Sequence, residues 1–321
     1  MKALWFDGRN LRLKEMPGPV MKKNEALIRV LYAGICSTDL EIFKGYMRFV
    51  GIPGHEFVGA VEKGPGQWLG KRVTGEINLA CGKCRYCQSG RARHCPQRTV
   101  LGISKKNGAF AEYLTLPVAN LHQVPDTVSD LDAVLVEPLA AALRILDQVE
   151  IRRNQKVLVL GDGKLGQLIA RAVRLKTRNL LMVGKHPKKL ALAKNLGIKT
   201  ALAQNCLKIP ASHKAEIVIE ATGNPQGLEQ AMELCRPEGT MVLKSTFHQA
   251  AKLNLARIVV DEIKIFGSRC GDFEKALSLL SRRKIRTRDI ISGIYPLDEF
   301  SSAFHKSISR DSLKVVFKCW E

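Results

Sequence analysis

The stretch KVLVLGDGKLGQLIARAVRLK, residues 156–176, decides the fold of the second half of the chain. It begins with the compact apolar run KVLVL, continues through GDGKLG and ends in a segment whose apolar residues recur at helical spacing. A GxGxxG pattern alone is common by chance, but a strand before it and a helix after it are the context that dinucleotide binding requires. Gly161 permits the tight turn, Gly163 lets the backbone approach a pyrophosphate, and Gly166 lets helix and strand pack closely. The pyrophosphate would lie at the helix N-terminus.

The same alternation of strand and helix continues after this stretch. Further strands are predicted at 179–184, 215–223, 240–246 and 263–267, and further helices at 187–197 and 227–235. Asn224 before Pro225 is typical of a helix N-cap, and Gly197 is typical of a helix C-terminus. Strands that alternate with helices of this length predict right-handed crossovers and a parallel sheet with helices on both faces. This half is therefore predicted to be doubly wound α/β.

The first 130 or so residues have a different texture. Short apolar or alternating runs, such as those at 26–36, 56–64, 71–79 and 109–117, are separated by glycine and proline and predict a β-rich domain. Helical spacing begins near Asp130. After Gly267 the pattern predicts two helices, at 271–283 and 297–309, and a final strand at 314–320. The fold class is α/β, with a β-rich part beside the parallel sheet.

Charge and hydropathy limit the class of protein. The formal net charge is +21 and the sequence pI is about 9.8, but lysine and arginine are spread over the whole length. A solvated basic surface accounts for this balance, and a surface that binds polyanions is the alternative. The N-terminus does not have the pattern of a signal peptide, and no segment approaches the roughly 20 apolar residues of a membrane span. We expect a cytoplasmic protein with reduced thiols.

Four cysteines lie close together in CGKCRYCQSGRARHC, residues 81–95. The spacing CxxCxxC lets a tight turn present successive sulfur atoms to one centre, and one more cysteine completes the set. Four thiolates satisfy tetrahedral Zn²⁺ and leave no position open, which is typical of a structural site. Unrelated thiols, a redox pair or an iron–sulfur cluster are the alternatives. The predicted structural zinc ligands are Cys81, Cys84, Cys87 and Cys95.

A second, dispersed set offers sulfur, nitrogen and oxygen ligands. Cys36 follows a predicted strand, His55 and Glu56 lie in GHEF, and Glu137 lies at a predicted helix start. Each has an ordinary alternative, since a lone cysteine is usually a small core residue, a lone histidine is usually satisfied by a hydrogen bond, and an acid suits a helix N-terminus. Together they could hold a zinc ion with one position left for water or substrate, which is the catalytic type of site.

The end of the second strand bears on the choice of nucleotide. An acid that reads the ribose is expected about 20 residues after the glycine-rich loop, but Gly184, Lys185 and His186 stand there. Lysine and histidine, which can both carry a positive charge, stand beside a small glycine and favour a 2′-phosphate, so we predict that NADP(H) binds better than NAD(H). The alternative is that both side chains face solvent. The predicted nucleotide-binding residues are Gly161, Gly163, Lys164, Leu165, Gly166, Gly184, Lys185 and His186.

These sets, in this order, resemble the zinc-containing medium-chain dehydrogenase/reductase family of alcohol, polyol and threonine dehydrogenases. The motifs AGICSTDLE, GHEFVG, the CxxCxxC lobe, GAFAEY, VEPLAA and VLVLGDGKLG carry the resemblance over nearly the whole chain. It implies a GroES-like β-rich catalytic domain at 1–139 with the zinc lobe at 81–95. It further implies a Rossmann doubly wound parallel sheet domain at 140–267 and a return to the catalytic domain at 268–321.

The resemblance also implies roles for single residues. Cys36, His55 and Glu137 match the catalytic-zinc positions, and Glu56 matches a residue that can alternate as a ligand. By the same resemblance, Thr38 contacts the substrate oxygen, Asp39 orients the zinc-bound histidine, and Glu41 stands where many relatives place a proton-relaying histidine. The chain would then carry two zinc ions, one catalytic and one structural.

The expected reaction is reversible hydride transfer between NADP(H) and a small alcohol, aldehyde or ketone. The resemblance implies a homo-oligomer, a dimer or tetramer, and a dimer through the cofactor domain is our first expectation. A basic zinc-containing protein that binds nucleic acid, or an inert nucleotide sensor, is the alternative, although aromatic residues make up only 6% of the chain and give little for base stacking.

Overall fold

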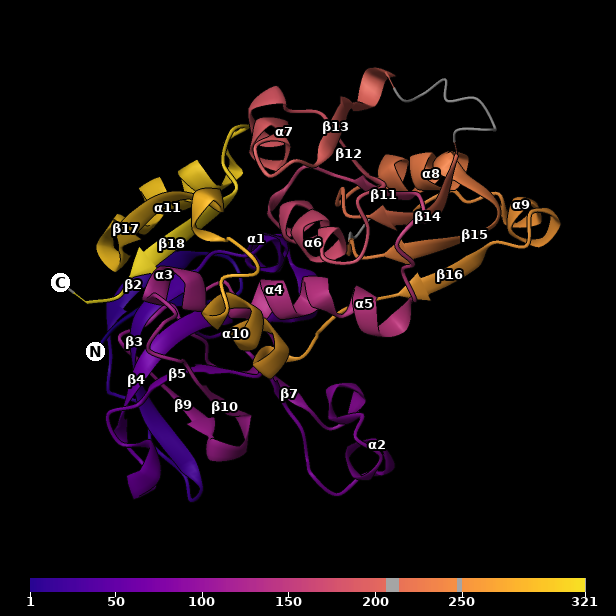
Figure 1. Ribbon diagram of the computed structural model, residues 1–321. Helices are drawn as coiled ribbons and strands as arrows, with labels where there is room; N and C mark the ends of the chain where they lie inside the picture. Colours follow the sequence, from indigo (N-terminus) through magenta and orange to yellow (C-terminus); the bar gives the residue numbers. More distant parts are fainter. Residues whose placement is uncertain (206–213, 247–249, 321) are drawn as a thin grey trace. The chain divides into compact units, whose positions relative to one another are not determined.

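A computed structural model describes residues 1–205, 214–246 and 250–320. The chain forms two compact units, which are Met1–Glu137 with Phe273–Glu321, and Pro138–Asp272. The divisions thus fall at 137/138 and 272/273, where the sequence suggested 139/140 and 267/268. Figure 1 shows the elements of each unit in sequence colours.

The second unit is built on a six-stranded parallel sheet in the order β13-β12-β11-β14-β15-β16. Its strands are β11 (Val157–Leu160), β12 (Leu180–Gly184), β13 (Lys199–Leu202), β14 (Ala215–Glu220), β15 (Cys235–Leu243) and β16 (Lys264–Gly267). Its helices are α5 (Ile145–Gln148), α6 (Lys164–Arg174), α7 (Pro187–Lys194), α8 (Pro225–Leu234) and α9 (Leu255–Val260), while α4 (Val136–Leu143) spans the division between the units. From β11 the chain adds strands first on one side and then on the other, so right-handed crossovers place helices on both faces. The predicted doubly wound fold is confirmed.

Helix ends in this unit follow the predicted chemistry. The Asn224 side chain accepts a hydrogen bond from the Gly227 amide at 2.9 Å, and Pro225 is the first residue of α8. Gly197 follows α7 with a φ of +72°, in the left-handed region that suits glycine. The core between α8 and the sheet includes Leu158, Val218 and Met232.

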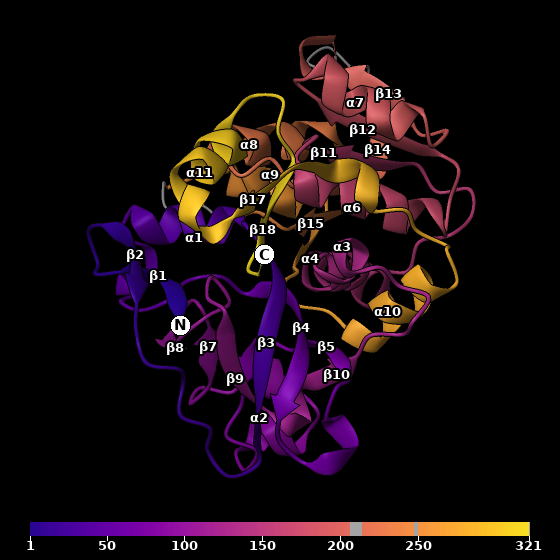
Figure 2. The same ribbon diagram turned by 90° about the vertical axis from the view of Figure 1, so that its left-hand side faces the viewer.

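The first unit contains a seven-stranded sheet in the order β10-β5-β4-β3-β18-β17, with β9 also paired to β3. Its sheet strands are β3 (Glu25–Gly34), β4 (Glu56–Lys63), β5 (Arg72–Gly75), β9 (Tyr113–Pro117), β10 (Leu121–Gln123), β17 (Ile291–Pro296) and β18 (Lys314–Lys318). Smaller sheets pair β1 (Lys2–Phe6) with β2 (Leu11–Glu15), and join β6 (Asn78–Leu79), β7 (Thr99–Leu101) and β8 (Lys105–Lys106). Figure 2 shows β3 and β4 side by side, and they pair antiparallel.

The helices of this unit are α1 (Ser37–Phe43), α2 (Arg85–Gln88), α3 (Asp130–Ala133), α10 (Phe273–Ser281) and α11 (Phe300–Ile308). The C-terminal strand β18 pairs with β3 through Val316 and Gly34, so the end of the chain is part of the β-rich unit. This pairing brings residues near 34 and near 314 together, and the candidate metal site depends on it. Within the part of the chain that the structure describes, no helix is long and apolar enough to cross a membrane.

Candidate functional site

The four cysteines of the lobe form one cluster. Cys81, Cys84, Cys87 and Cys95 each offer a sulfur atom, and these atoms all lie within 4.8 Å of one another. The short helix α2 begins just after Cys84 and contains Cys87, so one helical turn places both on the same side. The amide of Lys83 donates to Cys81 and lowers the pKa of its thiol to about 6. The four are free thiols.

The spacing of these sulfur atoms fits a single zinc ion. Tetrahedral zinc with Zn–S bonds of about 2.3 Å sets its sulfur atoms about 3.8 Å apart. The Cys84 and Cys87 sulfur atoms are 3.5 Å apart, and those of Cys81 and Cys87 are 3.9 Å apart. An iron–sulfur cluster fits less well, because its cysteines bind different metal atoms and stand further apart.

The second cluster lies where β3, α1 and β4 meet. Cys36 is the N-cap residue of α1, His55 immediately precedes β4, and Glu56 is the first residue of that strand. Their ligand atoms lie within 4.8 Å of one another. The antiparallel pairing of Gly34 with Glu56 explains this, because it aligns the end of β3 with the start of β4.

Asp39 lies beside the histidine of this cluster. Its Oδ2 accepts from the Cys36 amide at 2.7 Å, and its Oδ1 lies 3.3 Å from His55 Nδ1. With Nδ1 facing Asp39, the other ring nitrogen is left for a metal, which is the usual arrangement of a metal-binding histidine and its carboxylate. Burial opposes protonation of His55, but Asp39 and Cys36 outweigh it and raise the pKa of the imidazole.

Glu137 lies outside the group of three but close to it. As a residue it is partly exposed, yet its carboxyl group is enclosed, and this desolvation raises its pKa to about 7. The charges of Glu56 and Glu76 act in the same direction, while those of His55 and Lys314 oppose them. Desolvated carboxylates beside a cysteine and a histidine make a donor set that suits a divalent cation. The residues present therefore fit the catalytic type of zinc site.

A buried lysine that was not predicted from the sequence also contacts this cluster. Lys314, on β18, is fully buried, and its ammonium is hydrogen-bonded to the Glu56 carboxylate and to the Ile35 carbonyl, the latter at 3.1 Å. Burial opposes its charge, but Glu56, Cys36 and Asp39 outweigh it and raise the pKa of Lys314. A lysine inside the apolar run LKVVF was the signal in the sequence.

The remaining residues of this set lie on α1. The Thr38 hydroxyl is 3.7 Å from the Cys36 sulfur, so it borders the cluster. Glu41 points to Lys44 instead, with 2.8 Å between its Oε1 and the Lys44 ammonium. The structure thus brings Thr38 and Asp39 to the metal cluster, and it places Glu41 in a surface ion pair.

The glycine-rich loop occupies the switch point of the parallel sheet. It follows β11, which lies between β12 and β14, and α6 begins at Lys164 with Gly163 as N-cap. A Cβ on Gly161 would stand 2.4 Å from the Ala221 carbonyl oxygen, and one on Gly166 would stand 2.0 Å from that of Gly161. A Cβ on Gly163 would enter open space. This space beside a helix N-terminus fits a pyrophosphate.

The end of β12 holds a carboxylate after all, and it comes from the loop. Asp162 is buried and accepts from the His186 amide at 2.6 Å, and its Oδ1 lies 3.0 Å from His186 Nδ1. A Cβ on Gly184 would lie 2.4 Å from the Asp162 side chain, so the glycine makes room for this acid. Lys185 is exposed. The expectation that no acid stands here overlooked Asp162, because it came from counting residues along β12 alone.

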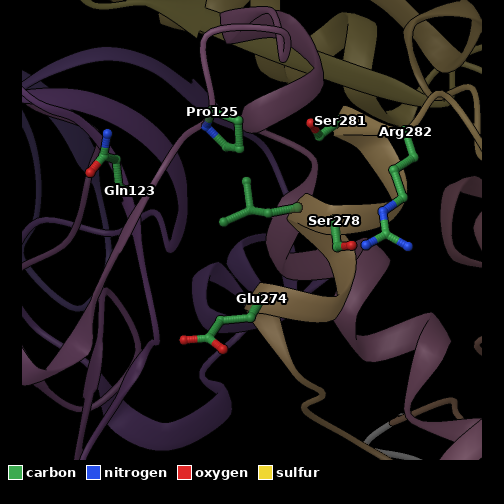
Figure 3. Close-up of a pocket in the computed structure, with 7 residues that line it drawn as sticks. Gln123, Pro125, Glu274, Ser278, Ser281 and Arg282 are labelled. Atoms are coloured by element: carbon green, nitrogen blue, oxygen red, sulfur yellow. The ribbon is translucent and has the colours of Figure 1, made fainter.

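A separate hollow of about 380 Å³ lies between α10 and the β10 region of the first unit (Figure 3). It is lined by Gln123, Pro125, Glu274, Leu277, Ser278, Ser281 and Arg282. It contains none of the predicted site residues.

Comparisons with known proteins match two parts of the chain to dehydrogenase families. Residues 22–126 match the alcohol dehydrogenase GroES-like domain, and residues 165–282 match the zinc-binding dehydrogenase family. The sorbitol dehydrogenase of Halalkalibacterium halodurans is 31% identical over 325 residues, which cover 95% of this chain and 94% of that protein.

Two solved structures share the fold over 99% of both chains, each with 25% identity and a TM-score of 0.91. One is an alcohol dehydrogenase from Escherichia coli CFT073 complexed with NADH. The other is a zinc-binding dehydrogenase from Sinorhizobium meliloti 1021 bound to NADP.

The fold and these matches define an oxidoreductase of the alcohol and polyol dehydrogenase type, with a GroES-like domain and a Rossmann domain. The chain belongs to the zinc-containing medium-chain dehydrogenase/reductase family. The matches give no support to the nucleic-acid-binding alternative.

Proposed function

We propose that this protein is a zinc-dependent dehydrogenase that transfers hydride between NADP(H) and a small polyol or its ketone. The cluster of Cys36, His55 and Glu56, with Asp39 behind the histidine, is the observation that carries the proposal. The polyol class is suggested by the similarity to a sorbitol dehydrogenase. Because cells usually keep NADPH reduced, carbonyl reduction is the direction we expect.

Cys36, His55 and one glutamate, Glu137 or Glu56, would hold the catalytic zinc. The chemistry that zinc would supply there is that of a Lewis acid, which would polarise the substrate oxygen at neutral pH. Asp39 keeps the His55 ring in the orientation that leaves one nitrogen for the metal. Thr38, whose hydroxyl borders Cys36, would accept the alcohol proton while it donates its own proton to water. Glu41 is left as a proton acceptor at the surface, with Lys44 to stabilise its charge.

Cys81, Cys84, Cys87 and Cys95 would hold the second zinc. With four sulfur ligands this site has no open position, so its role is to stabilise the lobe.

The proposed preference for NADP(H) depends on Lys185 and His186. The backbone amide and ring Nδ1 of His186 both contact the Asp162 carboxylate, so exposed Lys185 is left as the cation for the 2′-phosphate. Asp162 is the argument against the preference, since an acid at the end of β12 would accept a hydrogen bond from an unmodified ribose. If Lys185 decides the preference, NADPH binds more tightly than NADH. If Asp162 decides it, NADH binds more tightly than NADPH.

Titration of the zinc-loaded protein with NADPH and with NADH, followed by nicotinamide fluorescence, tests the proposal. We expect NADPH to bind at least tenfold more tightly, and NADPH to support reduction of ketose sugars. Equal affinities for NADPH and NADH would contradict the preference for NADP(H) but would leave the proposed dehydrogenase activity intact. If neither nucleotide binds, hydride transfer has no source and the proposed function is wrong.

For the assembly we propose a dimer through the edge of the cofactor unit. The edge strand β16 and the adjacent α9 expose Leu255, Val259, Val260 and Ile265. Exposed apolar side chains beside an unprotected strand edge are typical of an interface. Val259→Asp should give a monomer in sedimentation, and an unchanged mass would argue against this surface. We place the enzyme in the cytoplasm, where thiols stay reduced for metal binding.

A further inference from the structure

Lys314 deserves an explanation because a buried lysine is costly unless it is paired. Its side chain is fully buried in β18, and it reaches the Glu56 carboxylate and the Ile35 carbonyl. Ile35 directly precedes Cys36, so the ammonium lies between two backbone segments of the metal cluster. The acid in this ion pair is Glu56, which is also one of the three residues of the candidate metal site.

The two oxygens of Glu56 have different surroundings. Oε2 is hydrogen-bonded to Lys314, whereas Oε1 is buried without a hydrogen-bond partner among the residues that the structure describes. Glu56 also belongs to the group whose ligand atoms lie within 4.8 Å of Cys36 and His55. One oxygen is therefore committed to a cation of the protein, and the carboxylate remains within reach of a metal.

Gly34 shows that the chain makes room for this pair. A Cβ at Gly34 would stand 2.5 Å from Glu56 Oε2 and 3.5 Å from Lys314 Cδ. No side chain fits here while the carboxylate is turned toward the lysine.

We propose that Lys314 is a positioning residue that holds Glu56 as an exchangeable metal ligand and prevents it from binding permanently. The inference rests on the catalytic zinc site of the proposed function. Groups bonded to a carboxylate ligand tune its strength, and an ammonium on the carboxylate makes it a weaker donor to a metal. With Lys314 present, Cys36, His55 and Glu137 would be the resting ligands, and water or substrate would take the fourth position. Without Lys314, the uncompensated Glu56 carboxylate would be added to these four ligands and the metal would become five-coordinate.

Replacement of zinc by Co²⁺ tests this, because four-coordinate Co²⁺ absorbs visible light more strongly than five-coordinate Co²⁺. The spectrum of Cys36→Ser, which keeps only the four-cysteine site, is subtracted from each variant. We expect Glu56→Gln to leave the resting spectrum unchanged and Lys314→Met to lower the visible absorption at least twofold. The double variant Lys314→Met, Glu56→Gln should return to the wild-type spectrum, and Lys314→Arg should retain it.

Two results would overturn the proposal. A changed resting spectrum in Glu56→Gln would make Glu56 a permanent ligand, and a folded Lys314→Met with the wild-type spectrum would make Lys314 merely structural. If Lys314→Met does not fold, Gly34→Ala takes its place, because the added Cβ displaces the Glu56 carboxylate from Lys314. Gly34→Ala must then show the same loss of visible absorption. The double variant Gly34→Ala, Glu56→Gln must return to the wild-type spectrum. Failure of the catalytic site itself looks different, because the wild-type protein would then give no difference spectrum against Cys36→Ser.

Discussion

His55 and His186 each have a carboxylate at Nδ1, but their surroundings give them different tasks. His55 is buried, with Asp39 3.3 Å away and Cys36 beside it. His186 is partly exposed and meets Asp162 at 3.0 Å. We propose that the same pairing orients a metal ligand in one unit and shapes a nucleotide site in the other.

Lys185→Ala tests the nucleotide preference at the level of one residue. A hydrogen bond to a charged group contributes about 1.5–3 kcal/mol, so the Kd for NADPH should rise about tenfold or more while the Kd for NADH stays the same. Lys194→Ala, an exposed lysine at the end of α7, is the matched control. Equal losses for NADPH and NADH would show that Lys185 does not read the 2′-phosphate.

Glu25 gives a pH-dependent prediction away from both candidate metal sites. Burial opposes its ionisation, but the Lys22 amide and the Lys106 ammonium, at 3.0 and 3.1 Å, lower its pKa below 4.5. A lowered folded-state pKa gives stability that is present above pH 4.5 and is lost as the pH falls through the folded value. Wild type should exceed Glu25→Gln in free energy of unfolding by about 1–3 kcal/mol at pH 7, and by less at pH 4.

Denaturant titrations at the two pH values measure this difference. Glu62→Gln is the control, since its pair with Arg29 is over a third exposed and should contribute only about 0–1 kcal/mol. A Glu25 difference that does not shrink at pH 4 would show that its ionisation contributes nothing.

At the scale of elements, two glycines of the glycine-rich loop have different roles, one in stability and one in nucleotide binding. Gly166→Ala should destabilise the fold by about 1–3 kcal/mol, because its Cβ would stand 2.0 Å from the Gly161 carbonyl oxygen. Gly163→Ala should leave stability nearly unchanged, since nothing stands within 4 Å, yet weaken nucleotide binding at least tenfold by filling the pyrophosphate space. Thermal unfolding and fluorescence titration of both variants measure this. Tight nucleotide binding by folded Gly163→Ala would refute the assignment of the loop.

Regular periodicity made most elements of the parallel sheet predictable. The strands β11, β12 and β14 and the helices α6 and α7 lie in the predicted segments, and α8 begins at Pro225, two residues before the predicted 227. The short strand β13 and the helix α9 were not predicted. Helix α9 has apolar residues on several sides, with Leu255, Val259 and Val260 exposed, so it lacks a regular helical pattern. Strand β15 begins at Cys235, five residues before the predicted 240, and includes Glu238 at a φ of +57°.

Site residues were predictable where ligand spacing is local. The four cysteines lie within 15 residues and form the expected cluster. Lys314 lies 258 residues from Glu56, and only the pairing of β18 with β3 brings them together. Asp162 was missed because its side chain turns to the end of the neighbouring strand β12. Contacts of this kind depend on tertiary structure and leave no periodic signal in the sequence.

At the scale of the whole molecule, the two metal clusters should be independent, because they lie in different segments of the first unit and share no residue. We predict two zinc ions per chain in the wild type. Cys84→Ser should lose one zinc and lower the thermal midpoint, since a closed four-thiolate site contributes to folding. Metal analysis and calorimetry measure this, and an unchanged midpoint would show that the lobe is not structural.

The zinc content and turnover of Cys36→Ser test the central claim most directly. The account predicts a folded protein with one zinc per chain, nucleotide binding close to wild type, and turnover reduced by at least three orders of magnitude, because the substrate oxygen is no longer polarised. A Cys36→Ser protein with two zinc ions per chain and full activity would contradict the assignment of the catalytic site.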